Sequence, residues 1–172
     1  MNYVIIVLRL LHIFGGVYWV GAAWFMAFFI EPTMRAAGPG AQPFMQKLME
    51  GGRLSMSISI AAVVTVLAGG ILYFMNWFRG PASLASPMVL GFTIGAIIGL
   101  VALGVGGGVT GPTSVKMGKL GAEIAAGGKP PTPEQLEQMK ALQARLATAG
   151  RWTAWLTAAA LFFMATARNW VF

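Results

Sequence analysis

The sequence predicts an all-α polytopic membrane protein: a four-helix transmembrane bundle with a cytoplasmic helical-hairpin extension of spans three and four. First, 57% of the 172 residues are hydrophobic and only 10% are charged, whereas soluble domains carry about 25% charged residues. Second, four apolar runs reach the roughly 20 residues that a helix needs to cross a bilayer. Third, Lys and Arg gather in alternate loops. We expect residues 1–172 to form a single integral membrane domain.

The four predicted spans cover about residues 3–30, 54–78, 88–110 and 152–170. Helix-breaking residues separate them, because Pro and Gly end helices and start turns. These breakers are Glu31-Pro32 with Gly38-Pro39-Gly40, then Arg79-Gly80-Pro81, then Gly127-Gly128-Lys129-Pro130-Pro131. The first span is too long for the apolar region of a cleavable signal and is expected to remain in the membrane.

Two further helical segments are predicted outside the spans. Residues 43–50 place Phe44, Met45 and Leu48 on one face, which predicts a short interfacial helix ended by Gly51-Gly52. The cytoplasmic extension is expected over about 113–150. Its second helix begins at Thr132-Pro133-Glu134-Gln135, a capping pattern with proline at the first helical position.

The distribution of basic residues predicts the orientation. Nine Lys and Arg lie in the first and third loops: Arg35, Lys47, Arg53, Lys116, Lys119, Lys129, Lys140, Arg145 and Arg151. Only Arg79 and Arg168 lie on the opposite side. The positive-inside rule therefore places both termini outside a bacterial-type inner membrane. The net charge of +7 comes mainly from basic residues in these loops, a pattern that orients membrane helices, so no nucleic-acid partner is expected.

The third span is rich in glycine, with Gly91, Gly95 and Gly99 at every fourth position. Small residues on one stripe let helices approach closely in lipid. This stripe predicts close helix packing, and it is a candidate contact surface for a homo-oligomer or a larger membrane complex. The lipid bilayer is the second expected partner of the chain. Pro112 predicts a kink or a break in the third helix.

His12 is the only histidine of the chain, which has no Cys and no Asp. Arg9, His12, Gly16 and Trp19 lie on one helical stripe. With the N-terminus outside, His12 lies about 13 Å below Tyr3 at 1.5 Å per residue. Ionisable residues at membrane depth are costly and indicate a functional site. We expect all four residues to face the bundle interior and His12 to have a polar partner or ligand there.

Several roles are open for His12. As a core residue it would bond a carbonyl or a hydroxyl of a neighbouring helix, with Ser55, Ser57, Ser59, Thr65 and Thr93 available. Alternatively, His12 would be an axial ligand of the iron of haem b. Arg9 would then pair with a haem propionate, and the glycines would make room for the porphyrin ring. Proton relay or metal-ion transport is the remaining role. One chain cannot supply two histidines, so the second axial ligand would be Met, water or His12 of another copy, or the position would stay open.

The first span has His12-x6-Trp19-Val20-Gly21 and ends near Pro32. In these features it resembles the first helix of copper-resistance-D-like membrane proteins and their uncharacterised four-span relatives. The segments AAGPGAQPFMQKLM, GPTSVKMGKLGAEIAAGG and PEQLEQMKALQARL are also similar in style to those relatives. The same His-x6-Trp spacing resembles the membrane protoporphyrinogen oxidase family, which is haem-associated. That resemblance implies a redox role for His12, although this chain has no second histidine.

The sequence therefore favours a small membrane redox or electron-transfer component associated with haem b. In this hypothesis His12 is the ligand, and Arg9, Gly16, Trp19 and the glycine-rich third span form the pocket. The alternative is a non-enzymatic structural or accessory membrane subunit, or a protein related to copper transport. No motif for nucleotide binding, hydrolysis or a zinc site is present.

Overall fold

The computed structural model describes residues 3–41, 44, 47–48, 53–128 and 130–170, and this part of the chain is helical without a strand. The first helical segments are α1 (Tyr3–Phe25) and α2 (Glu31–Ala37), and α4 (Leu54–Asn76) follows. The second half contains α5 (Pro87–Val105), α6 (Gly111–Ala126) and α7 (Pro133–Thr166). Short 3-10 turns cover Gly38–Ala41, Pro81–Ala85 and Ala167–Asn169. The all-α fold class is confirmed.

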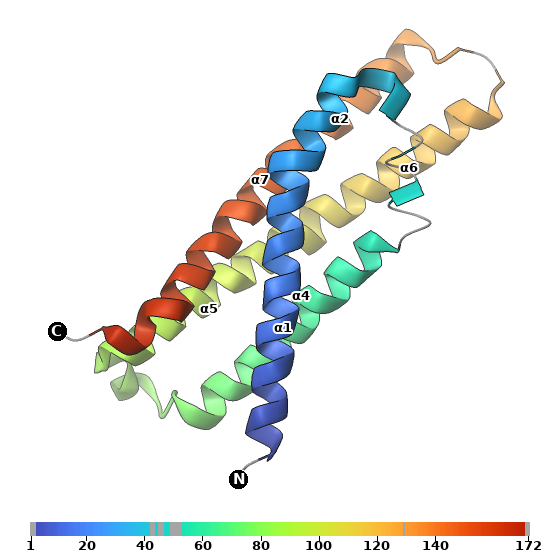
Figure 1. Cartoon of the computed structure of the whole chain (residues 1–172). Coiled ribbons are helices and arrows are strands. Elements are labelled where there is room, and N and C mark those ends of the chain that lie inside the picture. Colours follow the sequence, from blue (N-terminus) through green and yellow to red (C-terminus); the bar gives the residue numbers. More distant parts are fainter. Residues whose placement is uncertain (1–2, 42–43, 45–46, 49–52, 129, 171–172) are drawn as a thin grey trace.

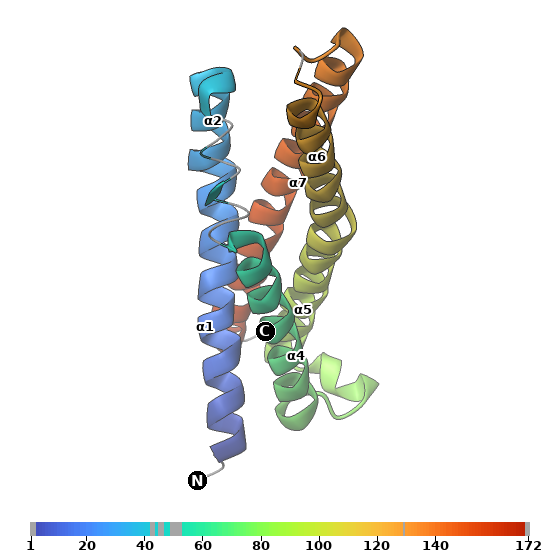
Figure 2. The ribbon, with the colours of Figure 1, turned by 90° about the vertical axis from the view of Figure 1, so that its right-hand side faces the viewer.

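The helices pack as two pairs (Figure 1): α1 lies along α4, and α5 with its continuation α6 lies along α7. The pairs meet in a small core where Trp19 of α1, Ala62 of α4 and Ala102 of α5 are buried together. Toward the ends of α2 and of the α6–α7 hairpin the two pairs diverge (Figure 2). The described chain is thus held together around the level of Trp19.

Three helices are long and apolar enough to cross a membrane: Tyr3–Ala37, Leu54–Asn76 and Pro87–Ala126. They indicate a membrane protein. The distribution of side chains agrees, because large apolar residues lie on the outside, among them Phe14, Val17 and Leu67 at 62–70% exposure. Such a surface is suited to lipid and not to water.

The interior is built from small residues. Among the described residues, the buried apolar side chains other than Trp19, Leu72, Val89 and Leu120 are all alanines: Ala27, Ala62, Ala68, Ala102, Ala147, Ala149, Ala154 and Ala167. Thr65, Thr113, Thr153 and Thr157 complete the set. Soluble domains instead bury their large apolar side chains. Small residues at helix contacts are typical of membrane bundles, in which close backbone approach and not water exclusion drives packing.

The first span does not end where the sequence predicts, whereas the third continues as helix beyond Pro112, as the predicted extension requires. Helix continues through Glu31-Pro32 to Ala37, and through Gly111-Pro112 to Ala126. A π-helical turn precedes each proline, at Met26–Ile30 and at Gly106–Thr110. Proline lacks the N–H that would bond the carbonyl four residues earlier, and a π turn absorbs the misfit without ending the helix. The predicted break at Pro32 is therefore wrong, and at Pro112 the helix is irregular but unbroken.

The predicted start of α7 is confirmed. Thr132 Oγ1 accepts a hydrogen bond from the Gln135 backbone N–H at 3.3 Å, and Gln135 Oε1 accepts one from the Thr132 N–H at 3.0 Å. The pKa of Glu134 lies below its usual value, because its own backbone N–H and the Thr132 hydroxyl bond the carboxylate. From here α7 runs antiparallel to α6 and α5 (Figure 1). The predicted interfacial helix at 43–50 lies largely outside the described residues.

The glycines of α5 pack inside the chain. A Cβ at Gly91 would lie 2.9 Å from Ala167 Cβ, and one at Gly95 would lie 3.2 Å from the Ala160 carbonyl oxygen. Gly99 has no atom this near. Close helix approach is confirmed, but the expectation that Gly91 and Gly95 form an intermolecular surface is wrong, because α7 and the turn after it already cover them.

Gly91→Ala should weaken the α5–α7 contact. Both Gly91→Ala and Gly99→Ala gain the same helix propensity, but only the first adds a methyl group that would lie 2.9 Å from Ala167 Cβ. Overpacking of this kind costs about 1–3 kcal/mol. Thermal unfolding in detergent should show a lower midpoint for Gly91→Ala and an equal or higher one for Gly99→Ala. Equal midpoints would contradict this packing.

Candidate functional site

His12 lies on the face of α1 that packs against α4. Its Nδ1 lies 2.8 Å from the backbone carbonyl oxygen of Thr65, so Nδ1–H donates and the carbonyl accepts. A helix carbonyl has two lone pairs and can accept this bond besides its helical one. The expectation that His12 finds a polar partner on a neighbouring helix is confirmed, and the partner is the carbonyl of Thr65 and not a hydroxyl.

Gly69, one turn after Thr65 on α4, makes room for the imidazole. A Cβ at Gly69 would lie 2.6 Å from both Cε1 and Nδ1 of His12, a contact that real Cβ atoms do not make. The Nδ1–Cε1 edge of the ring therefore lies directly against the α4 backbone. Glycine is required here because of close approach, since its backbone is regular helix.

The second ring nitrogen of His12 is accessible. Nε2 has no hydrogen-bond partner among the described residues, and it is not among the buried atoms that lack one. In a neutral imidazole, an Nδ1–H that bonds a carbonyl leaves the lone pair on Nε2. The same arrangement orients histidines that bind metals through the other nitrogen. His12 thus offers one free, oriented ligand atom.

Thr65 adds a second polar group to this contact. Its hydroxyl is buried and has no hydrogen-bond partner in the described structure. A Cβ at Gly15 would lie 2.6 Å from that hydroxyl, and one at Gly16 would lie 3.5 Å from the Thr65 methyl carbon. Gly15 and Gly16 therefore bring α1 against α4 at the level of Thr65.

Trp19 lies deeper along the same face. It is 6% exposed and packs with Ala62 and Ala102, as the predicted interior position requires. His12, Gly16 and Trp19 thus share the inward side of α1, in agreement with the predicted stripe.

Arg9 does not belong to this inward side, and that prediction is wrong. Its side chain is exposed, whereas Ile5 and Leu8 are the less exposed positions of the preceding turns. The face toward α4 therefore runs through Ile5, Leu8 and His12, and Arg9 lies beside it. An arginine so near the predicted outer surface can extend its head group toward water.

The glycine-rich third span does not contribute to the His12 site. Its Gly91 and Gly95 pack against α7 and the turn that follows α7, on the other helix pair. The residues that do surround His12, Thr65 and Gly69, come from α4. Sequence reasoning considered Thr65 only for its hydroxyl and did not identify Gly69. The repeat Ala61-x3-Thr65-x3-Gly69, a stripe of small residues, is the signal that indicates this contact face.

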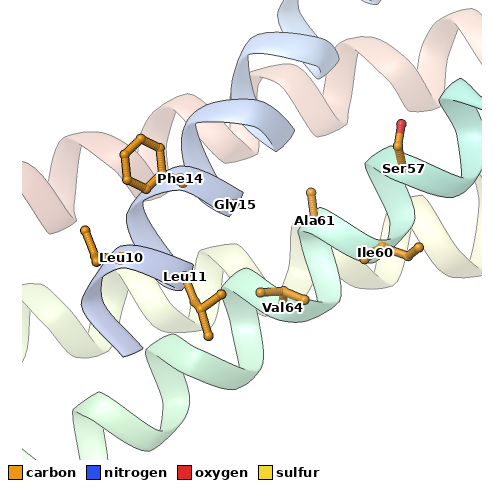
Figure 3. Close-up of a pocket in the computed structure, with 8 residues that line it drawn as sticks. All are labelled: Leu10, Leu11, Phe14, Gly15, Ser57, Ile60, Ala61 and Val64. Carbon is orange, nitrogen blue, oxygen red and sulfur yellow. The ribbon is translucent and has the colours of Figure 1, made fainter. Parts of the chain in front are cut away.

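A groove of about 420 Å³ runs over the outer side of the α1–α4 pair (Figure 3). Its lining carries one polar side chain, Ser57, whose hydroxyl bonds Tyr18 at 2.7 Å. Apolar side chains and Gly15 supply the rest: Leu10, Leu11, Phe14, Ile60, Ala61 and Val64. His12 does not line it. The groove is suited to an apolar chain and offers no ligand for a metal.

Within the part of the chain that the structure describes, no three His, Cys, Asp or Glu side chains lie together. The chain matches no protein-family model, and neither the curated proteins nor the solved structures gave a significant match.

The contact between His12 and Gly69 can be measured by a double-mutant cycle. Gly69→Ala should destabilise the protein by about 1–3 kcal/mol, because the new methyl group displaces the imidazole. Gly70→Ala, with no atom within 4 Å of the added carbon, is the matched control. In a His12→Ala background Gly69→Ala should lose most of its effect. An unchanged effect in that background would show that the two residues do not touch.

Proposed function

We propose that this chain is a small integral membrane protein that binds haem b, with Nε2 of His12 as an axial ligand of the iron. The observation that carries the proposal is the 2.8 Å bond from Nδ1–H to the Thr65 carbonyl oxygen. It holds the imidazole in one orientation and one tautomer, with the lone pair of Nε2 free.

The donor set favours haem over a bare metal ion. The chain has one histidine, no cysteine and no aspartate. A zinc ion needs several Cys, His or carboxylate ligands, whereas the porphyrin of haem supplies four ligands and needs only one or two from protein. An accessible imidazole bonded to a backbone carbonyl fits that requirement.

The residues of this chain have separate roles in the proposed site. His12 holds the group, and the Thr65 carbonyl and Gly69 position its ring. Arg9, exposed one turn before His12, is available for a propionate through charge-assisted hydrogen bonds. Haem b bound by one histidine supplies one-electron transfer or an open position for a small ligand. Because the chain has one histidine, any further protein ligand to the haem would have to be a methionine or His12 of another copy.

Haem binding can be tested in the intact protein. Protein produced in haem-replete cells and purified in detergent should show a Soret band, which His12→Ala should abolish. Phe14→Leu is the control, because Phe14 is 70% exposed on α1 and lines the outer groove, which His12 does not line. A Soret band that survives His12→Ala would contradict the proposal. So would a folded wild-type protein that stays colourless when haemin is added.

The second candidate is a structural or accessory membrane subunit without a cofactor. The close fit of the imidazole against Gly69 favours it, because His12 then acts as an interhelical contact that orders α1 on α4. This candidate predicts colourless, folded wild-type protein and loss of stability in His12→Ala.

We further propose that α7 supplies a fourth span, with both termini outside and the α6–α7 hairpin in the cytoplasm. Support comes from the packing of α7 along α5 and from the nine basic residues of the two loops. α7 has 34 residues, so at 1.5 Å per residue it is about 50 Å long. It exceeds the roughly 30 Å hydrocarbon thickness of a bilayer.

Single cysteines can test this topology, since the native chain has none. In spheroplasts a membrane-impermeant maleimide should label Ala82→Cys but not Gly127→Cys, both of which replace exposed residues. Both should react after solubilisation in detergent, which controls for accessibility. Labelling of Gly127→Cys in intact spheroplasts would show that the orientation is the opposite of the proposed one.

A further inference from the structure

The cleft between α2 and α7 is a separate site from that of His12. It has a volume of about 340 Å³, and its lining residues are Glu31, Pro32, Arg35, Ala36 and Arg151. The volume lies in the range of small-molecule sites, about 300–1,000 Å³. The lining combines three charged side chains with two apolar ones, which is unusual for the surface of this chain, where large apolar side chains predominate.

An aromatic contact closes the cleft on the side of the membrane spans. Trp24 of α1 donates its indole N–H to the Ala154 carbonyl oxygen at 2.9 Å. The ring of Trp155 lies 5.7 Å from those of Trp24 and Phe28. Beyond this contact α2 and α7 diverge, as Figure 2 shows. Arg151, one turn before Trp155, and Arg35, two turns after Phe28, therefore line the opening from opposite helices.

The cleft carries a net positive charge. Arg35 forms an ion pair with Glu31 on its own helix. Arg151 is exposed and forms no ion pair with any residue that the structure describes. Two guanidinium groups against one carboxylate leave one positive charge, and a planar guanidinium suits a phosphate because it can donate two parallel hydrogen bonds.

The surroundings of the cleft match the boundary of a bilayer. Trp152 and Trp155 are 62% and 57% exposed on α7, next to Arg151. Exposed tryptophans mark the interface between the hydrocarbon and the head groups. An anion held at Arg151 would thus lie at head-group level, with exposed apolar side chains below it for acyl chains.

We infer that this cleft binds the phosphate of an anionic phospholipid between Arg151 and Arg35. Basic pockets between membrane helices on the cytoplasmic side are suited to such head groups. Arg151 contributes the free charge, Arg35 is shared between Glu31 and the phosphate, and the tryptophans contact the acyl chains. The inference rests on the proposed membrane topology, which the cysteine labelling tests independently.

Native mass spectrometry of the detergent-purified chain can measure the apparent Kd of phosphatidylglycerol and of phosphatidylcholine with the same acyl chains. We expect tighter binding of phosphatidylglycerol. Arg151→Gln should weaken it about fivefold, since one basic residue near the surface contributes about a factor of this size. Glu31→Gln should strengthen it, because Arg35 is released and a negative charge is lost. Circular dichroism confirms that each variant is folded.

Arg145→Gln is the matched control, because it removes another exposed arginine from α7 that does not line the cleft. It should leave the preference for phosphatidylglycerol unchanged. Equal binding of both lipids, an equal loss in Arg145→Gln, or full competition by millimolar inorganic phosphate would overturn the inference. The first two outcomes indicate nonspecific charge, and the third indicates a site for a soluble anion.

Discussion

The structure depends on close approach between helix backbones. In lipid, apolar side chains gain little by leaving their surroundings, so helices associate through van der Waals packing over small residues. This chain places alanine, glycine and threonine at nearly all its buried positions and turns leucine, valine and phenylalanine outward. The α1–α4 and α5–α7 pairs are two instances of the same solution, with Gly15 and Gly69 in the first and Gly91 and Gly95 in the second.

The His12 contact follows from this packing. An imidazole at membrane depth costs free energy unless its polar groups are bonded. Because Gly69 has no side chain, the ring of His12 comes near enough to the α4 backbone for Nδ1 to reach the Thr65 carbonyl. One nitrogen is thereby satisfied, and the other keeps its lone pair. The small-residue surface that packs α1 on α4 therefore also fixes the orientation of the His12 ring.

The sequence predicts the fold class and the membrane character well, because the length and hydropathy of the apolar runs follow directly from the order of the residues. It predicts the start of α7, because the Thr132–Gln135 capping box is a local pattern. The inward face of α1 is harder to predict. Most lipid-facing and interior-facing positions of α1 are apolar, so the hydrophobic periodicity does not show whether Leu8 or Arg9 faces α4. The interior position of His12 and Trp19 could be predicted, because polar ring atoms and small neighbouring residues lie on that face of α1. The role of Gly69 could not, because it depends on where α1 crosses α4.

The helices continue through both prolines, to Ala37 and to Ala126, and this continuation shapes the predicted cytoplasmic end. A sequence such as Ile30-Glu31-Pro32 indicates a break because proline removes one hydrogen bond and its ring collides with the preceding turn. Here the π-helical turn Met26–Ile30 relieves that misfit, and α2 continues in nearly the direction of α1. This continuation carries Glu31 and Arg35, and beyond the Trp24–Trp155 contact α2 and α7 diverge. Had the helix ended at Pro32, no wall would face Arg151, so the charged cleft exists because the proline is tolerated.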